Sequence, residues 1–233
     1  MAAARRAVGS RGSRAALLAP SGQEQPEPPD DGTPVQERLL AAASRLFAER
    51  GFALTSVQEI VERAGVTKGA MYHYYSSKDD LLQEIYTRLL AGQALRLEAI
   101  ADAVDRPERE RLRAAAADLV VSTLENLDDA TVSWRSMHML PPERMAEVRL
   151  ERRRFHERFR ALIEQGQAEG VLRADISADL AAHQFFGGVH HLGTWYHADG
   201  ELAPESIGET FADMLLRGLD DRVGPESTIP DHD

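Results

Sequence analysis

The chain has 233 residues, 43% of them hydrophobic, which suits one or two domains with a buried core. It contains no cysteine, so disulfides, thiolate metal sites and thiol nucleophiles are excluded, and a reducing compartment fits. No window reaches the roughly 18 unbroken apolar residues of a membrane span, and the apolar run at residues 15–19 is too short for a signal peptide core. We therefore expect a soluble cytoplasmic protein with no membrane partner.

The net charge of −11 is unevenly distributed along the chain. Residues 1–33 hold four basic and four acidic residues, and residues 34–90 hold seven of each. Residues 91–233 hold 16 basic and 27 acidic residues, so they carry all of the excess negative charge. A polyanion such as a nucleic acid would therefore orient the molecule with the neutral N-terminal part toward itself.

Residues 1–33 combine four arginines with Ala, Gly and Ser and then become rich in Pro, Glu and Gln. They hold too few large apolar groups to offset the entropy of ordering, so we expect a disordered arm. The basic cluster could extend onto a nucleic acid, but a dispensable tail is the favoured interpretation because the signal is only four charges: Arg5, Arg6, Arg11 and Arg14.

Four helices are predicted in the next segment. Apolar residues recur every three or four positions over residues 35–50, between Pro34 and Gly51. Ser56 followed by Glu59 has the spacing of a capping box and starts a second helix. A turn at residues 65–66 and a cap at Thr67 start a third helix through residue 75. Ser77 with Asp80 repeats the box and opens a long helix to about residue 100.

The rest of the chain also has helical periodicity. Helices are predicted at residues 107–127, 131–140, 143–169, 177–197 and 204–219, with a polar tail from residue 220. No stretch alternates like a strand, and no repeat period is present. The predicted class is all-α, with a helix-turn-helix domain at residues 34–82, a second helical domain at residues 83–221 and a polar tail at residues 222–233.

The third helix has two different faces. Met71 and Tyr75 are four residues apart and are expected to pack it onto its own domain. Its opposite face carries Lys68, Gly69, Tyr72, His73 and Tyr74. A helix of this length rises about 12 to 14 Å and can lie across a DNA major groove about 12 Å wide. This face is therefore a candidate DNA-reading surface.

Residues 35–82 closely resemble the DNA-binding domain of the TetR family of transcriptional regulators. The resemblance rests on the runs VQERLLAAA, LFAERGF, TSVQEI and AGVTKGAMYHYY and on the lysine at position 78. It implies a homodimeric repressor that binds palindromic double-stranded operator DNA and leaves it when a small-molecule effector enters the C-terminal domain. It also implies that the C-terminal helices form the dimer.

The resemblance assigns roles residue by residue. It implies base contacts from Thr67, Lys68, Gly69 and His73, with Gln58 at a position that sometimes reads a base. It implies phosphate contacts from Ser56, Tyr72, Tyr74 and Lys78. Ala70 departs from the Ser or Thr that is frequent in the family at this position, which removes one hydroxyl contact.

Residues 185–196 concentrate aromatics and glycines within a predicted helix. Glycine costs a helix about 1 kcal/mol relative to alanine, so its use here indicates close approach of another helix or a ligand. With the family resemblance, we expect a symmetric four-helix dimer interface formed by the last two long helices. The residues expected there are Phe185, Gly188, Phe211, Met214 and Leu215.

A ligand pocket is expected among the other C-terminal aromatics. Core packing is the more common role for any single one of them. The candidates are Trp134, Met137, His138, Phe155, Phe159, His191 and Trp195. Most arginines of the cluster at residues 149–160 are expected to be solvated, with one or two near an anionic headgroup. Residues 165–173 and 195–200 are similar to the branch of the family that responds to fatty-acyl or steroid-derived CoA thioesters.

Three other functions are less well supported by the sequence. A metal sensor built on His183, His190 and His197 is disfavoured because a seven-residue spacing spans about 10.5 Å along a helix. An enzyme is disfavoured because no catalytic motif or phosphate-binding glycine loop occurs, and no cofactor is expected. A small-molecule or lipid-binding protein of the same fold that does not use DNA remains the alternative function.

Overall fold

The computed structural model describes residues 32–220, and every regular element in this range is a helix. The expected disordered arm and polar tail lie outside the described residues, apart from residues 32 and 33. Within the described range the elements are α1 (Val35–Arg50), α2 (Val57–Ala64), α3 (Lys68–Tyr74), α4 (Lys78–Ala101), α5 (Glu108–Glu125), α6 (Leu127–Ser136), η1 (Met137–Met139), α7 (Pro142–Ala168), α8 (Ala178–His190), η2 (Leu192–Thr194) and α9 (Pro204–Gly218).

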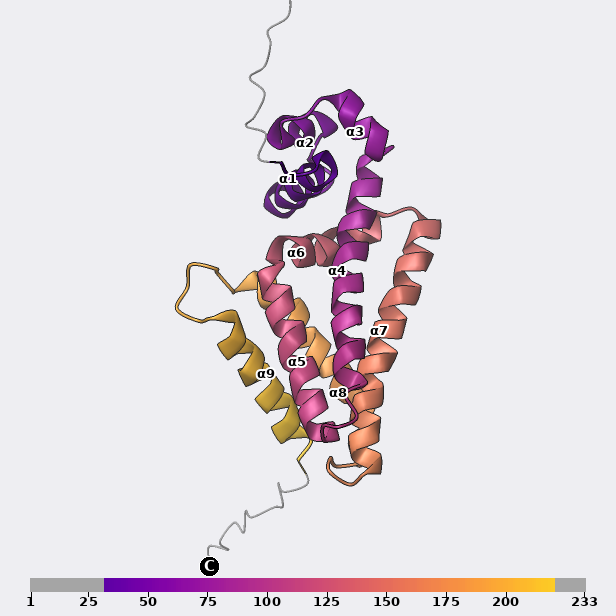
Figure 1. Cartoon of the computed structure of the whole chain (residues 1–233), viewed down its shortest axis with the longest axis vertical. Coiled ribbons are helices and arrows are strands. Elements are labelled where there is room, and N and C mark those ends of the chain that lie inside the picture. The colour runs from indigo at the N-terminus through magenta and orange to yellow at the C-terminus, as the bar shows by residue number, and fades with distance from the viewer. Residues whose placement is uncertain (1–31, 221–233) are drawn as a thin grey trace, which may run out of the picture.

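The helices form a small head on an elongated body (Figure 1). Helices α1 to α3 make the head, and α3 lies at its outer end. Helix α4 runs from the head into the body, where α5 and α7 pack against it. Helix α8 packs on α7 and α5, and α9 packs on the other side of α5. Helix α6 crosses the top of the body directly below α1. The predicted all-α class and the order of its elements are confirmed.

Side-chain caps fix where the head helices begin. Ser56 and Ser77 each form a capping box, with Glu59 and Asp80 as the respective partners. Thr67 caps α3 by accepting a hydrogen bond from the Ala70 amide at 3.1 Å. These three predicted helix starts are confirmed, because the capping hydrogen bonds depend only on residues close in sequence.

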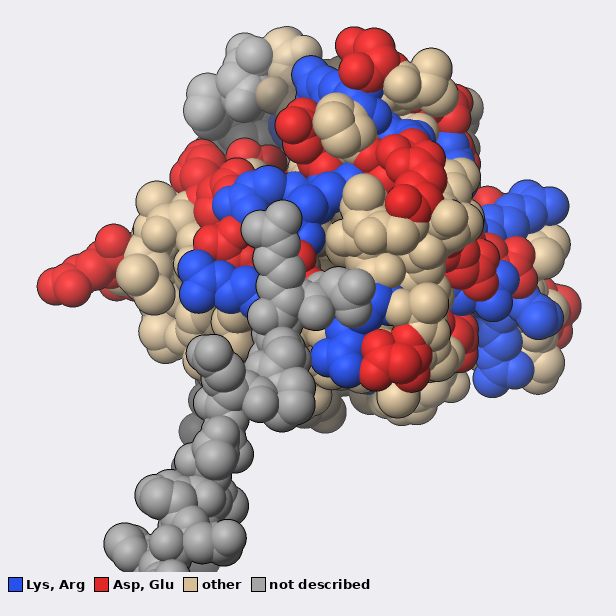
Figure 2. Space-filling model, turned by 90° about the horizontal axis from the view of Figure 1, so that it is seen from below, with Lys and Arg blue, Asp and Glu red and all other residues tan. Residues whose placement is uncertain are grey.

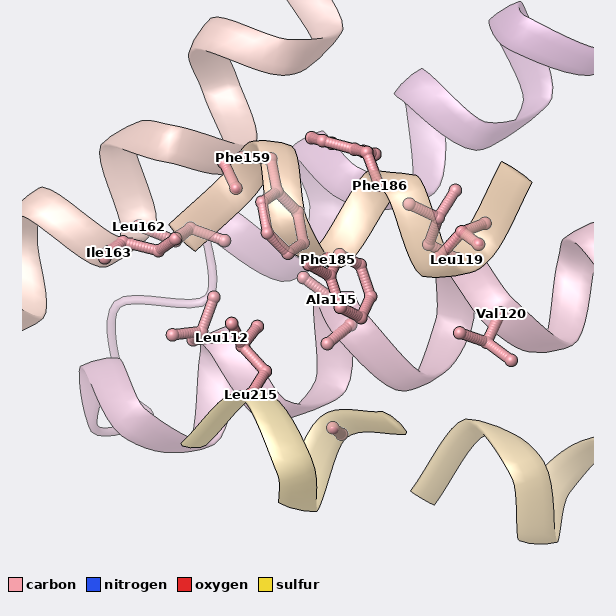
Figure 3. Close-up of a cluster of buried hydrophobic side chains, with 14 of the residues drawn as sticks. Leu112, Ala115, Leu119, Val120, Phe159, Leu162, Ile163, Phe185, Phe186 and Leu215 are labelled. Carbon is pink, nitrogen blue, oxygen red and sulfur yellow. The ribbon is translucent and has the colours of Figure 1, made fainter. Parts of the chain in front are cut away.

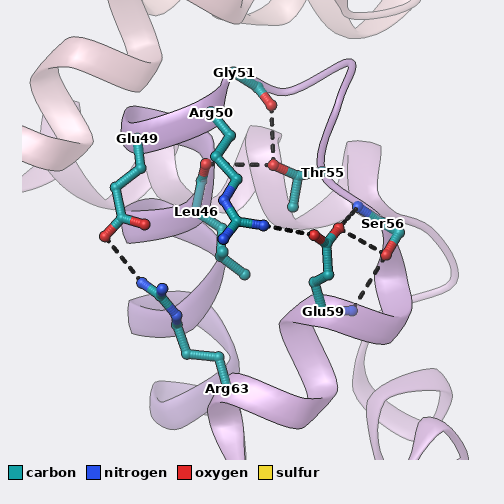
Figure 4. A network of polar contacts seen from close by, with 8 residues as sticks. All are labelled: Leu46, Glu49, Arg50, Gly51, Thr55, Ser56, Glu59 and Arg63. Atoms are coloured by element: carbon teal, nitrogen blue, oxygen red, sulfur yellow. Dashed lines mark hydrogen bonds and ion pairs between the residues drawn. The ribbon is translucent and has the colours of Figure 1, made fainter.

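A polar network joins α1 to α2 (Figure 4). The Thr55 hydroxyl, which is buried, donates to the carbonyl oxygens of Gly51 at 2.9 Å and Leu46 at 3.3 Å. Arg50 pairs with Glu59 at 2.7 Å, so the carboxylate that closes the capping box also contacts the preceding helix. The loop between the two helices is thereby held at both ends, which fixes the orientation of the helix-turn-helix.

The core of the body is built on aromatic stacking and aliphatic packing (Figure 3). Phe159 of α7 stacks on Phe185 of α8, with ring centroids 5.1 Å apart and planes 5° apart. Leu112 of α5 and Ile163 of α7 are fully buried beside them. Burying each large apolar side chain contributes about 1.5 to 3 kcal/mol, so this cluster holds α5, α7, α8 and α9 together.

The buried core of the head extends into helices α6 and α7 of the body. The buried cluster that contains the apolar residues of α1 to α4 also includes Val132 of α6 and Met145 and Val148 of α7. The Ser44 hydroxyl of α1 donates a hydrogen bond to the Asp129 carboxylate of α6. Helix α6 therefore packs against the head from below, and the boundary expected at residue 82 falls inside the continuous helix α4.

Two C-terminal helices differ from their predicted extents. Helix α6 begins at Leu127 rather than residue 131, directly after Asn126, which ends α5. Helix α8 ends at His190 rather than residue 197. A side chain at Gly193 would come within 2.7 Å of Thr131 Oγ1, so the chain after α8 packs tightly on α6. This long-range contact gave no signal in the local sequence.

Basic and acidic groups are intermixed on the surface of the described residues. At the end of the body farthest from α3, basic and acidic groups lie side by side (Figure 2). Arg109 with Asp220 and Arg158 with Glu98 are among the ion pairs, at 2.8 and 2.7 Å. Within residues 32–220, none of the helices combines the length and apolar composition needed to cross a bilayer.

Candidate nucleic-acid interface and ligand cavity

Helix α3 presents one buried and one exposed face. Met71 is 0% exposed and Tyr75 6%, which confirms that these two residues pack α3 onto the head. Tyr72 is 54% exposed and Tyr74 48%. The remaining residues named for this surface are also exposed: Thr67, Lys68, Gly69 and His73. The arrangement leaves a polar, mostly uncharged face with one lysine at its leading end.

Gly69 is a glycine that the fold itself does not require. A Cβ added at this position would meet only Thr67 Oγ1, at 3.7 Å, which is an ordinary contact. Its backbone is helical, so no left-handed conformation demands glycine either. The absence of a side chain is therefore most useful to something that approaches α3 from outside.

Ser56 and Gln58 are exposed at the start of α2 but already have hydrogen-bond partners. The Ser56 hydroxyl donates to the Glu59 carboxylate at 2.8 Å and accepts from the Glu59 amide at 3.2 Å. The Gln58 amide donates to Glu62 at 2.5 Å. These contacts hold both side chains at the surface, at the start of α2.

Lys78 lies differently from the expected phosphate contact. Its ammonium group donates to the carbonyl oxygens of Phe52 at 2.9 Å and Thr55 at 3.1 Å, with Ala53 at 3.4 Å, and sits 4.5 Å from the Phe52 ring centroid. An ammonium group has three donors, and all three face this loop. Lys78 therefore ties the start of α4 to the loop between α1 and α2.

A cavity of about 650 Å³ lies in the body. This is within the range typical of small-molecule sites. Helices α4 to α8 all contribute to its wall, and α6 supplies its roof beneath the head. The buried part of the lining is mainly apolar, and includes Leu119, Phe155, Phe186 and Val189.

The outer part of the cavity is strongly basic. Its lining includes five arginines against two acidic residues, Glu157 and Asp179. Arg153 pairs with Glu157 at 3.1 Å and Arg160 with Glu164 at 3.6 Å. The other three have no ion pair within the described part of the chain: Arg135, Arg149 and Arg152. An apolar interior with a cationic opening suits an amphipathic anion.

An aromatic stack closes one side of the cavity. The rings of Trp134 and His190 lie 4.0 Å apart and 18° from parallel, and the Arg152 guanidinium lies 5.4 Å from the Trp134 ring. Burial, with Arg152 and His191 nearby, lowers the pKa of His190 to about 4. His190 is therefore neutral at pH 7 and retains one donor and one acceptor nitrogen.

The seven expected ligand residues separate into two groups. Trp134, Met137 and Phe155 line the cavity. Phe159 is fully buried in the core behind it. The remaining three are exposed and outside the lining: His138, His191 and Trp195. Because α8 ends at His190, the residues after it leave the helical register that had aligned His191 with Trp195.

The five expected dimer residues also separate. Phe185 and Leu215 are buried inside the subunit, so within this structure they are core residues. Phe211 is half-buried and packs against Gly188, where an added Cβ would come within 3.1 Å of its ring. Met214 is 67% exposed on α9. Helical spacing alone did not separate the inner face of α9 from its outer face.

Sequence reasoning did not bring together three residues that line the cavity: His156, Asp179 and His183. Burial and the neighbouring His183 lower the pKa of His156, an effect that Asp179 opposes. Sequence spacing groups His183 only with histidines of its own predicted helix. The four-residue spacing of Asp179 and His183 was a usable signal, but nothing local placed His156 of α7 opposite them.

Comparisons with known proteins match both halves of the chain. Residues 39–85 match the family described as bacterial regulatory proteins, tetR family. Residues 105–219 match the family described as tetracyclin repressor-like, C-terminal domain. The two matches cover most of the head and most of the described body, and leave out residues 86–104 between them.

Individual relatives agree with these matches. The chain is 28% identical to the HTH-type transcriptional repressor KstR2 of Rhodococcus jostii over 83% of this chain and 97% of the relative. It is 31% identical to the HTH-type transcriptional repressor DhaR of a Mycobacterium species over 64% of this chain and 76% of the relative. The structure of AibR in complex with isovaleryl coenzyme A and operator DNA shares its fold, with a TM-score of 0.67 and 24% identity over 80% of this chain and 98% of AibR.

These relatives are transcriptional regulators rather than enzymes. The exposed α3 in its helix-turn-helix, the helical body below it and the two family matches lead to one conclusion. The chain belongs to the TetR family of transcriptional regulators.

Proposed function

We propose that the protein is a transcriptional repressor that binds palindromic operator DNA as a homodimer and is released by a small-molecule effector held in the cavity. The observation that carries this proposal is the position of α6. One side of α6 packs against α1 through Val132 and Asp129, and the other lines the cavity through Thr131 and Trp134. A ligand that displaces α6 therefore acts directly on the head.

The head would read DNA with the exposed face of α3. Lys68 donates to base acceptors or to a phosphate at the leading end of the helix, where Gly69 lets the backbone come close. Tyr72 and Tyr74 extend hydroxyls to flanking phosphates, as does Ser56 at the start of α2. His73 and Thr67 supply further polar contacts to bases, and Gln58 reaches a base from α2.

The homodimer would form through the outer faces of α8 and α9. Leu180 on α8 and Met214 on α9 are exposed large apolar residues, and the half-buried Phe211 lies between the two helices. Exposed apolar surface of this kind marks candidate contact surfaces. A twofold axis through this face presents two heads to one face of a duplex, which suits a palindromic site.

The proposed effector is an acyl-CoA-type thioester. The cavity offers an apolar interior for an acyl or steroid-derived chain and unpaired arginines at its opening for phosphates. AibR, which shares the fold, was solved with a CoA thioester and operator DNA. The CoA moiety would be held by Arg135, Arg149 and Arg152. The acyl chain would contact Phe155 and Phe186.

DNA binding is tested with purified protein and the DNA upstream of its own gene, measured by fluorescence anisotropy at several salt concentrations. The affinity is expected to fall steeply as salt rises. Lys68→Ala is expected to weaken DNA binding and to alter base preference. Tyr72→Phe is expected to weaken binding to all DNA sequences by the same factor. Unchanged affinity for both variants would rule out α3 as the reading helix.

Effector binding is tested by adding acyl-CoA thioesters of increasing chain length to the protein–DNA complex. A thioester that fits is expected to release the DNA, while free CoA and the free acid release it less. Arg149→Gln should weaken release by the thioester without changing DNA affinity. If free acids act as well as thioesters, the proposed CoA contacts at the opening are wrong.

A further inference from the structure

Two histidines and a carboxylate meet at the wall of the cavity. Asp179 and His183 are one helical turn apart on α8, so both side chains leave the same face. His156 approaches them from α7, with its ring centroid 4.4 Å from that of His183. One potential ligand atom from each of the three residues lies within 4.8 Å of the other two.

The distances between these potential ligand atoms are close to the distances between atoms that share one bound ion. His183 Nε2 lies 3.6 Å from one Asp179 oxygen, and His156 Nδ1 lies 4.0 Å from the other. Ligand atoms that share a tetrahedral Zn²⁺ at about 2.0 to 2.1 Å are roughly 3.4 Å apart. Side-chain rotations alone can close the remaining gap, because Asp179 and His183 are at the surface and free to adjust.

We propose that His156, Asp179 and His183 form a binding site for a divalent transition-metal ion, with Zn²⁺ the expected occupant. Two imidazoles and one carboxylate are a donor set that Zn²⁺ uses when it keeps an open coordination position. The Nε2 atom of His156 is buried and has no hydrogen-bond partner in the described structure, and its Nδ1 atom faces Asp179 at 4.0 Å.

The charged groups around the site influence its affinity for a cation. Arg152 and Arg160 on α7 are near His156 and oppose a cation. Glu164 pairs with Arg160, and Asp179 supplies the negative charge at the site itself. The Asp179 carboxylate also repels an anion from this corner, so the arginines hold an anion elsewhere on the opening. Affinity is expected to be below that of a closed four-ligand zinc site.

The site faces the cavity, since all three residues line it. Three protein ligands leave a coordination position for water or for an anionic group of a bound effector. This consequence rests on the proposed function and would make effector binding stronger when the ion is present. Metal binding itself does not depend on that proposal, because it is measured without effector or DNA.

The test uses the full-length chain without an affinity tag, treated with chelator and titrated with Zn²⁺ by calorimetry and with Co²⁺ by visible absorption. One bound ion per chain is expected, and Co²⁺ should show the intense bands of a low-coordinate site. His183→Ala and Asp179→Asn should each weaken Zn²⁺ binding more than the roughly 10- to 100-fold that loss of a supporting group costs.

His191→Ala is the matched control, because His191 is an exposed histidine next to α8 but outside the cluster. It should bind Zn²⁺ like the unmodified chain. Both ligand variants change exposed side chains, so folding is checked by an unchanged melting temperature in chelator. The proposal is overturned if the ligand variants bind Zn²⁺ as tightly as the unmodified chain, or if His191→Ala loses as much affinity as they do.

Discussion

At the scale of single residues, Gly69 separates what the fold needs from what DNA binding needs. Gly69→Ala should leave the free energy of unfolding within about 1 kcal/mol of the original value or raise it, because alanine favours a helix. It should weaken operator binding by about tenfold or more, since a methyl group would stand between α3 and the bases. Denaturant unfolding and anisotropy measure the two effects separately.

Gly92→Ala on α4 is the matched control. Its added Cβ would also lie 3.7 Å from a side-chain atom, so the local room is the same. This variant should keep full operator affinity. Equal affinity for Gly69→Ala and the unmodified protein would mean that the α3 backbone does not approach the DNA closely.

Lys78 is expected to contribute to stability, and Lys68 to the salt dependence of operator binding. Lys78→Met removes three hydrogen bonds to loop carbonyls and should lower the free energy of unfolding by about 1 to 3 kcal/mol. Lys68→Met removes an exposed ammonium and should leave stability unchanged while lowering the salt slope of operator binding by about 1. If Lys78→Met instead lowers the salt slope at full stability, Lys78 contacts a phosphate after all.

His190 should make stability depend on pH. Its folded pKa of about 4 lies below the usual 6.5, so below pH 6.5 the unfolded chain takes up a proton that the folded chain does not. Between pH 7 and pH 5 this linkage removes about 1 to 2 kcal/mol of stability. Denaturant unfolding of His190→Gln should therefore show a smaller loss of unfolding free energy between pH 7 and pH 5. His138→Gln, a control at an exposed position, should show the same loss as the original chain.

At the scale of elements, the sequence predicted best those helices whose starts depend on neighbours in the chain. The boxes at Ser56 and Ser77 and the cap at Thr67 are local, and α2, α3 and α4 began where expected. The chain after α8 packs instead on α6, where a side chain at Gly193 would meet Thr131. The order of helices could therefore be predicted, but the extents of α6 and α8 could not.

The candidate sites divide in the same way. The two faces of α3 follow from four-residue spacing, so Met71 and Tyr75 were assigned correctly to the buried side. The cavity lining depends on how five helices pack, and spacing could not tell that Phe159 faces the core while His190 faces the cavity. Amphipathic periodicity gives the buried side of one helix but not which neighbour covers it.

Helix α6 is the element on which the proposed release depends. Val132 is 1% exposed and belongs to the buried cluster shared with α1. Val132→Ala should cost about 1 to 3 kcal/mol of stability. It should also increase amide hydrogen exchange in α1 and α6 before the rest of the body is affected.

Val104→Ala is the control for this element, because Val104 is 82% exposed in the loop after α4. It should change neither stability nor exchange. If Val132→Ala destabilises the protein without raising exchange in α1, then α6 and the head are not coupled through this contact, and effector release must use another route.

At the scale of the whole molecule, DNA binding requires two heads at a fixed separation. Met214→Glu would place a charge on the outer face of α9, where two copies are proposed to meet, and should convert dimers to monomers. Operator affinity should then fall by about a hundredfold or more, because linking two half-site contacts raises affinity by roughly 10²- to 10⁴-fold. Sedimentation velocity and anisotropy measure the two effects.

Leu95→Glu gives the control at this scale, since Leu95 is 74% exposed against 67% for Met214 but lies on α4 rather than on α8 or α9. It adds the same charge to the acidic body, so any general repulsion from DNA appears in both variants and cancels in the comparison. A loss of operator affinity confined to Met214→Glu and accompanied by monomers would tie DNA binding to pairing through α9. Dimers that persist in Met214→Glu would place the interface on another face, and the separation of the two α3 helices would then have to be set by different elements.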